Sequence, residues 1–233
     1  MKNTTLNDFV FGDAKSKITL QLILANHIAF PDANKGKNGI ILYGVFGSGK
    51  STLASLLCKW LEKVKSNSEL NVQPYKCDVS SSTSARTLDT IVSASSVLSF
   101  NNSGLHYFIL DEADNMNYQA QRNLKALMST RQDCVFILMT NYRKNIDQGI
   151  QSRSFAINMN AAHPQQYVSP LRKIAKDEYN ADLPDAVLLK TAASGQGSWR
   201  DMRSGIEVAA HKHNHAVIDL DNYDYPVSVS KGV

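Results

Sequence analysis

Short apolar runs alternate with stretches of helical periodicity along the first two thirds of the chain. The runs Gly39–Tyr43, His106–Leu110 and Cys134–Met139 are almost continuously apolar, as is typical of strands buried on both faces of a parallel sheet. Between them, apolar residues recur three or four positions apart, which is typical of helices. The alternation predicts an α/β domain with a parallel sheet. The expected strands are 39–43, 70–79, 106–110, 134–139 and 155–159, and the expected helices are 14–30, 51–65, 86–97 and 118–129.

The pattern changes near Ala161. From there the periodicity predicts only helices, over 164–179, 184–193 and 199–212. We therefore expect an α/β domain at 1–160, a small helical domain at 161–215 and a tail at 216–233. The tail is acidic and aromatic; it could dock a partner, but a disordered end is the simpler interpretation.

Composition excludes several classes of protein. Apolar residues make up 43% and charged residues 20% of the chain, which argues against a disordered or fibrous protein. Cys58, Cys77 and Cys134 form no C-x-x-C pair, so neither a disulfide framework nor a zinc ribbon is expected. The N-terminus resembles no signal peptide, and no apolar run is long enough to span a membrane. We expect a cytoplasmic protein with no membrane contact, and the net charge of +4 permits nucleic-acid binding without requiring it.

The segment Gly44–Ser51 matches the phosphate-binding pattern G-x-x-x-x-G-K-[ST], which is also called the Walker A motif. It follows an expected strand and opens an expected helix, as the motif requires. Its glycines let backbone N–H groups surround phosphate oxygens, and the helix N-terminus adds positive potential. Lys50 is expected to reach the β- and γ-phosphates, and Ser51 to bind Mg²⁺. The predicted nucleotide-binding residues here are Gly44, Val45, Phe46, Gly47, Ser48, Gly49, Lys50, Ser51 and Thr52.

Two carboxylates follow the apolar strand that ends at Leu110. Asp111 would lie at the carboxyl end of the sheet, where ligands bind in open α/β folds. We expect Asp111 to hold Mg²⁺ and Glu112 to act as base or orienter for the attacking water. The alternative is that the two carboxylates are simply the acidic first turn of a helix. The phosphate-binding loop upstream favours the catalytic interpretation over this one.

Three further candidates are ambiguous from spacing alone. Thr140-Asn141 ends an apolar strand and could place a polar group against the γ-phosphate, or it could simply terminate the strand in a turn. Arg153 and Arg200 could each be catalytic, but an exposed surface arginine is the ordinary interpretation for both.

A hydroxyl-rich segment precedes the helix expected at 86–97. Such groups at a helix start can follow a phosphate backbone, or they can cap the helix. The candidate DNA-binding residues are Ser80, Ser81, Ser82, Thr83, Ser84 and Arg86. His211, His213 and His215 could suggest a metal site, but a solvated helix end is the better interpretation.

The order of these segments resembles the clamp-loader family of AAA+ ATPases, which includes the small subunits of replication factor C and their phage counterparts. Asn7–Gly12 resembles the family's adenine-pocket segment, and Ser84–Asp89 resembles the segment after its second strand. The sequences LDEAD, LMTNY, IQSRS and GSWRD resemble its Walker B, sensor 1, arginine-finger and sensor 2 motifs. The resemblance covers about residues 6–212.

The resemblance implies a role for each matching residue. Val10 and Phe11 would bind the nucleotide, Asn141 would sense the γ-phosphate, and Arg200 would contact the phosphates from the helical lid. Arg153 would act as a finger in a neighbouring subunit, so the site would be complete only in an oligomer. The implied ligands are ATP and Mg²⁺. The implied partners are primer–template DNA, a sliding clamp and other AAA+ loader subunits, with a pentamer as one form.

Two departures from the family pattern qualify these expectations. The finger motif has Ser154 where the family has cysteine, which leaves the arginine charge unchanged. Family members continue into a helical collar, whereas about 20 residues follow His213 here. We therefore expect a partner to supply the collar, or a weaker assembly, or a related loader with another target. The resemblance implies an ATP-hydrolysing subunit that acts in DNA replication by loading a sliding clamp onto primer–template DNA. The alternatives are a helicase loader or other DNA-remodelling ATPase, and a nucleotide-dependent scaffold. The compactness of the chain suggests a viral protein acting in a host cell.

Overall fold

The computed structural model of the chain describes residues 4–67, 72–79 and 84–214. The chain divides into two units. The first comprises residues 1–163 together with Gln196–Trp199, and the second comprises 164–195 and 200–233. The first unit thus includes a short turn that follows most of the helical segment in sequence.

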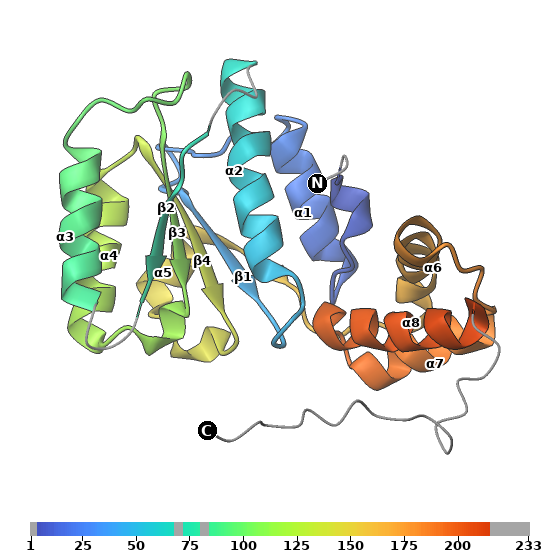
Figure 1. The fold of residues 1–233 in the computed structure, drawn as a ribbon. Helices are drawn as coiled ribbons and strands as arrows, with labels where there is room; N and C mark the ends of the chain where they lie inside the picture. Colours follow the sequence, from blue (N-terminus) through green and yellow to red (C-terminus); the bar gives the residue numbers. More distant parts are fainter. Residues whose placement is uncertain (1–3, 68–71, 80–83, 215–233) are drawn as a thin grey trace, which may run out of the picture. The chain divides into compact units, whose positions relative to one another are not determined.

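A five-stranded parallel sheet forms the first unit, in the order β2-β3-β4-β1-β5 (Figure 1). This confirms the predicted α/β class and every expected strand. The strands are β1 (Gly39–Tyr43), β2 (Tyr75–Asp78), β3 (His106–Asp111), β4 (Cys134–Thr140) and β5 (Ser154–Asn158). Because all five strands run in the same direction, their carboxyl ends share one edge of the sheet.

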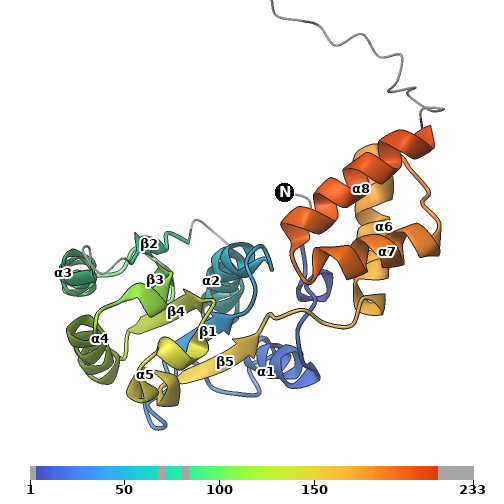
Figure 2. The ribbon, with the colours of Figure 1, turned by 90° about the horizontal axis from the view of Figure 1, so that it is seen from below.

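Helices cover both faces of the sheet (Figure 2). Alternate strand residues point to opposite sides, so Ile40 packs into the core under one layer of helices and Ile41 into the core under the other. The first layer consists of α1 (Ala14–Leu24) and α2 (Lys50–Ser66), and the second of α3 (Ser84–Ser95), α4 (Tyr118–Thr130) and α5 (Gln148–Ser152). Burial on both sides explains why the strand sequences are continuously apolar.

Several element boundaries differ from the sequence-based expectation. The helix expected over 14–30 is wrong in extent, because α1 ends at Leu24 and Asn26 takes a left-handed conformation with φ of 58°. Strand β2 is shorter than the expected 70–79 segment, and α3 ends at Ser95. The short helix α5 was not predicted; it begins where Asp147 accepts a hydrogen bond from the Gly149 amide.

A buried carboxylate is an unexpected part of the first core. Glu62, on α2, is only 1% exposed. Its two oxygens accept hydrogen bonds from the Ser103 amide at 2.8 Å, from the Ser103 hydroxyl and from the Tyr107 hydroxyl at 3.0 Å. A buried charge is tolerated when it is hydrogen-bonded in this way, and here the bonds tie α2 to the start of β3.

The second unit contains helices α6 (Gln165–Tyr179), α7 (Asp185–Gly195) and most of α8 (Trp199–Asn214), as the periodicity predicts. Its described residues contain no strand. Leu171, Leu188 and Ile206 supply one fully buried side chain from each helix. Ion pairs between Arg203 and Glu178 and between Arg172 and Asp185 add contacts at the surface. Within the described part of the chain, no helix combines the length and apolarity that crossing a membrane would need.

Candidate active site

The loop between β1 and α2 has the backbone conformation of a phosphate cradle. Gly47 and Gly49 have φ of 72° and 91°, values that other residues rarely adopt. Gly49 is the N-cap of α2, so the free amides of a 17-residue helix begin at Lys50. These amides and the helix dipole favour an anion at this end.

Gly44 is needed because of a close approach by the chain. Its amide donates to the Thr140 carbonyl at 3.3 Å. A Cβ at this position would lie 2.6 Å from the Asn160 amide nitrogen and closer still to the Met159 carbonyl group. The loop therefore leaves β1 pressed against the segment that follows β5, and this contact admits no side chain.

Lys50 links this loop to the end of β4. Its Nζ donates to the Gly44 carbonyl at 2.9 Å, to the Val45 carbonyl at 2.8 Å and to Asn141 Oδ1 at 2.9 Å. Burial lowers the pKa of Lys50 from its usual value, while the charges of Asp111 and Asp114 act in the opposite direction. An anionic ligand at Nζ would stabilise the charged form further. The structure thus brings Lys50, Asn141 and Asp111 to one place.

Glu112 occupies a strained position directly after β3. Its φ of 52° is left-handed, which is uncommon for a residue with a side chain. The carboxylate is exposed, and its Oε2 accepts a hydrogen bond from Asn115 Nδ2 at 2.9 Å. Its amide donates to Asp111 Oδ1 at 2.9 Å. Asn115 was not predicted as a site residue, because a single amide in a short turn carries no sequence signal.

Hydroxyls of the loop and of the first turn of α2 fit a nucleotide and its metal. Ser48 is 3% exposed, and among the described side chains its Oγ is one of two buried polar atoms without a hydrogen-bond partner. Ser51 and Thr52 are exposed in the first turn of α2. A hydroxyl together with the Asp111 carboxylate is the hard oxygen donor set that Mg²⁺ prefers. The residues present therefore fit a magnesium nucleotide.

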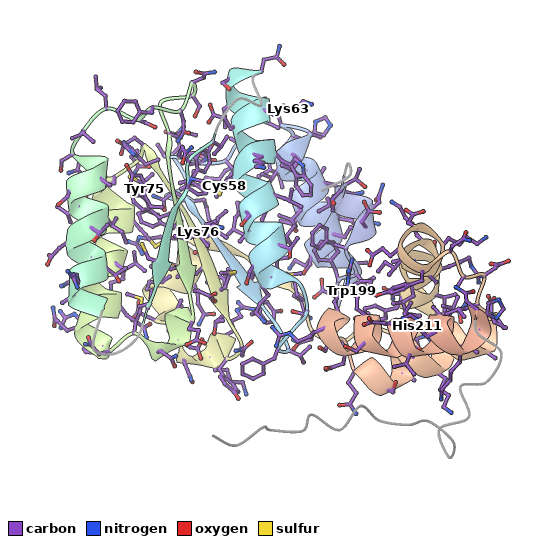
Figure 3. The ribbon with its side chains drawn as sticks, viewed as in Figure 1. Cys58, Lys63, Tyr75, Lys76, Trp199 and His211 are labelled. Carbon is purple, nitrogen blue, oxygen red and sulfur yellow. The ribbon has the colours of Figure 1, made fainter. Side chains whose placement is uncertain are left out.

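Aromatic side chains surround the start of α2. A Cβ at Gly49 would lie 3.5 Å from Trp199 Cδ1 and 3.8 Å from Phe9 Cε1. The Trp199 amide donates to the Gly47 carbonyl at 2.8 Å (Figure 3 labels Trp199). Val10 and Phe11 are buried next to Phe9 in the sequence. Phe9 and Trp199 were missed as site residues; the signal was their presence in the adenine-pocket and GSWRD segments.

Arg153 lies at the opposite edge of the sheet from the phosphate-binding loop. It precedes β5, whose first residue pairs with the first residue of β1, whereas the loop follows the end of β1. Five residues of strand separate the two edges, or about 16 Å. The guanidinium donates to Ser129 Oγ at 2.9 Å and to the Gly149 carbonyl at 2.9 Å.

The remaining candidates lie on other elements of the two units. Arg200 has an exposed side chain on α8 and belongs to the second unit. Ser84 begins α3 and Arg86 is exposed on its first turn, whereas Ser80, Ser81, Ser82 and Thr83 lie outside the described residues. His211 and His213 are on α8, His215 lies outside the described residues, and no group of three metal-binding side chains occurs in the part of the chain that the structure describes.

Comparison with protein families identifies the first unit. Residues 40–160 match the model of the ATPase family associated with various cellular activities (AAA). The chain belongs to the AAA family. The match runs from β1 to the residues after β5, and it therefore contains the phosphate-binding loop, both carboxylates and Asn141.

Curated relatives of this AAA chain are subunits of replication factor C. Replication factor C small subunit 2 of Pyrobaculum islandicum is 34% identical over 113 residues, which are 48% of this chain and 35% of that protein. The large subunit of Methanothrix thermoacetophila is 26% identical over 89% of this chain and 42% of that protein. Subunit 5 of Mus musculus is 27% identical over 72% of this chain and 48% of that protein. The AAA chain thus spans less than half the length of each of these three relatives.

The fold also matches solved structures of another protein. A variant of RuvB from Thermotoga maritima superposes with a TM-score of 0.59 over 88% of this chain and 62% of that chain, at 16% sequence identity. At this identity the match concerns the fold, and it confirms the α/β sheet domain followed by a helical part.

The close approach at Gly44 predicts that a single methyl group added at this residue destabilises the fold. Gly44→Ala should lower the free energy of unfolding by about 2–4 kcal/mol, because the new Cβ must displace backbone atoms. Urea unfolding measures this loss. Gly104→Ala is the matched control, since Gly104 has a φ of +73° but no neighbouring atom within 4 Å, and it should lose only about 1 kcal/mol. Equal losses in the two variants would contradict the close approach.

Proposed function

We propose that this chain is an ATP-hydrolysing, clamp-loader-like subunit that acts in DNA replication by loading a sliding clamp onto primer–template DNA. The observation that carries the ATPase part is the hydrogen bond of 2.9 Å between Lys50 Nζ and Asn141 Oδ1. It brings the lysine of the phosphate-binding loop together with the polar end of β4, beside the carboxyl end of β3. The replication factor C names of the curated relatives support the replication part.

Each candidate residue of the first unit would have a separate role in ATP hydrolysis. Lys50 would exchange its carbonyl partners for phosphate oxygens. Ser51 and Asp111 would hold Mg²⁺, which neutralises charge on the β- and γ-phosphates when it is bound. Glu112 would orient a water molecule and accept its proton, and Asn141 would hold the γ-phosphate in line with that water.

The position of Arg153 supports an active site that is completed by a neighbouring subunit. Its place at the opposite edge of the sheet keeps its guanidinium away from the chain's own phosphate-binding loop. An arginine there can act on the nucleotide of a neighbouring subunit, as arginine fingers do. Arg200 of the helical unit would supply a second positive charge, to the nucleotide of its own chain. Other loader subunits are therefore the proposed partners, with an oligomer, and a pentamer as one form, as the active state.

Substitutions at Lys50 and Glu112 test the ATPase. Lys50→Ala should abolish measurable ATP binding, because it removes the charge that faces the phosphates. Glu112→Gln should bind ATP with unchanged affinity but lose at least about 100-fold in kcat, because the amide cannot accept the proton. Calorimetry with a non-hydrolysable analogue and phosphate release with Mg-ATP measure the two effects. Lys59→Ala, on the exposed face of α2, is the control and should behave as wild type; full turnover by Glu112→Gln would show that another group acts as the base.

A second experiment tests the DNA and clamp part. ATP hydrolysis, measured with loader subunits and a sliding clamp present, should rise on addition of primed DNA and should fall steeply with salt, because phosphate contacts release counterions. Arg86→Ala should reduce the slope of log affinity against log salt by about one. Lys190→Ala removes one charge from the second unit and should leave the slope unchanged. Hydrolysis that ignores primed DNA would favour a helicase loader or a nucleotide-dependent scaffold.

Mixing two inactive variants tests the role of Arg153. Arg153→Ala subunits should bind ATP normally but lose about 10³-fold in hydrolysis as an assembly, if the guanidinium acts as other arginine fingers do. Mixed with Lys50→Ala subunits, they should regain activity, because some interfaces then pair an intact Lys50 with a neighbour's intact Arg153. Ser129→Ala removes only an intrachain partner of Arg153 and should stay active. A mixture that co-assembles and stays inactive would exclude action across the interface.

A further inference from the structure

Thr140 lies where three segments of the active site meet. It is the last residue of β4 and is only 1% exposed. Its backbone pairs with Tyr43 at the end of β1, and its carbonyl accepts the amide of Gly44, the first residue of the phosphate-binding loop. Its position therefore fixes the end of β4 relative to that loop.

The Thr140 hydroxyl adds a bond to the third segment, which is the turn after β3. Its Oγ1 donates to Asp114 Oδ1 at 2.6 Å and accepts the Tyr142 amide at 2.9 Å. A hydroxyl has one proton, so the bond to Asp114 also fixes the lone pair that faces Tyr142. A hydrogen bond of this length to a carboxylate is short and charge-assisted.

The two bonds connect the segments that carry the catalytic candidates. Asn141 lies between Thr140 and Tyr142, and its side chain reaches Lys50. Asp114 lies two residues after Glu112, in the same turn that carries the Asn115 bond to the Glu112 carboxylate. One hydroxyl–carboxylate bond thus joins the turn that holds Glu112 to the turn that holds Asn141.

We propose that Asp114 and Thr140 are a positioning pair that holds Glu112 and Asn141 at fixed positions relative to Lys50 during turnover. This inference rests on the proposed ATPase function. Neither side chain needs to touch the nucleotide, because each acts through the residue beside it.

A pair of substitutions at Thr140 separates this role from general stability. Thr140→Val keeps the shape and removes the hydroxyl, whereas Thr140→Ser keeps the hydroxyl. Thr140→Val should lower kcat about tenfold or more, because a charge-assisted hydrogen bond is lost, while the affinity for a non-hydrolysable ATP analogue changes less than about threefold, since Lys50 and the loop remain. Thr140→Ser should restore kcat to within about threefold of wild type.

Two further variants complete the test. Asp114→Ala should match Thr140→Val, and the double variant should be no slower than either single one, because both remove the same bond. Thr191→Val removes a buried hydroxyl that bonds to a helix carbonyl in the second unit and should leave kcat unchanged. Four outcomes would each overturn the proposal. Thr140→Val could keep the wild-type kcat, or it could lose only ATP affinity. Thr140→Ser could fail to restore kcat, or the losses in the double variant could be additive.

Hydrogen exchange makes the result independent of ATP hydrolysis. The Tyr142 amide should exchange slowly in wild type and Thr140→Ser and faster in Thr140→Val and Asp114→Ala. If wild-type protein fails to hydrolyse ATP, the proposed function fails, and this exchange pattern still decides whether the pair holds the turn. Unchanged exchange in both Thr140→Val and Asp114→Ala would overturn the pair.

Discussion

A half-buried ammonium group is the constraint on which the active site depends. Lys50 Nζ is bonded to two carbonyls of its own loop and to the amide oxygen of Asn141. A charge taken out of water needs such partners, and here they come from the end of β1 and the end of β4. Burial nevertheless lowers the pKa of Lys50, which means that these partners do not fully replace water around the charge. An anion at this position would stabilise the charge further.

The parallel sheet makes this arrangement possible. Because β1, β3 and β4 are neighbours that run in one direction, their carboxyl ends bring the phosphate-binding loop, Asp111 and Asn141 to one edge. Gly44 lets the loop lie against the segment after β5, and Gly49 lets α2 begin with its amides free. The start of β5 lies at the other edge, which separates Arg153 from this site.

The features that repeat or have fixed spacing were predictable from the sequence. Continuous apolar runs gave the buried strands, and the G-x-x-x-x-G-K-S spacing gave the loop and the start of α2. Features that depend on tertiary contacts were not. Helix α1 ends early at a left-handed Asn26, and Glu62 enters the core because Ser103 and Tyr107 meet it there. Asp114 ends the LDEAD segment and Asn115 follows it, but their roles were not predicted, since their partners are set by how the turn after β3 folds against β4.

A crystal structure of the chain with Mg²⁺ and a non-hydrolysable ATP analogue tests the account most directly, through the contacts of Lys50 Nζ. The account predicts that Nζ leaves the carbonyls of Gly44 and Val45 for oxygens of the β- and γ-phosphates, and that Asn141 stays within reach of the γ-phosphate. Ser51 and Asp111 should lie in the Mg²⁺ coordination shell. A nucleotide bound elsewhere, or a Lys50 that keeps all three of its present partners with nucleotide in the loop, would contradict it.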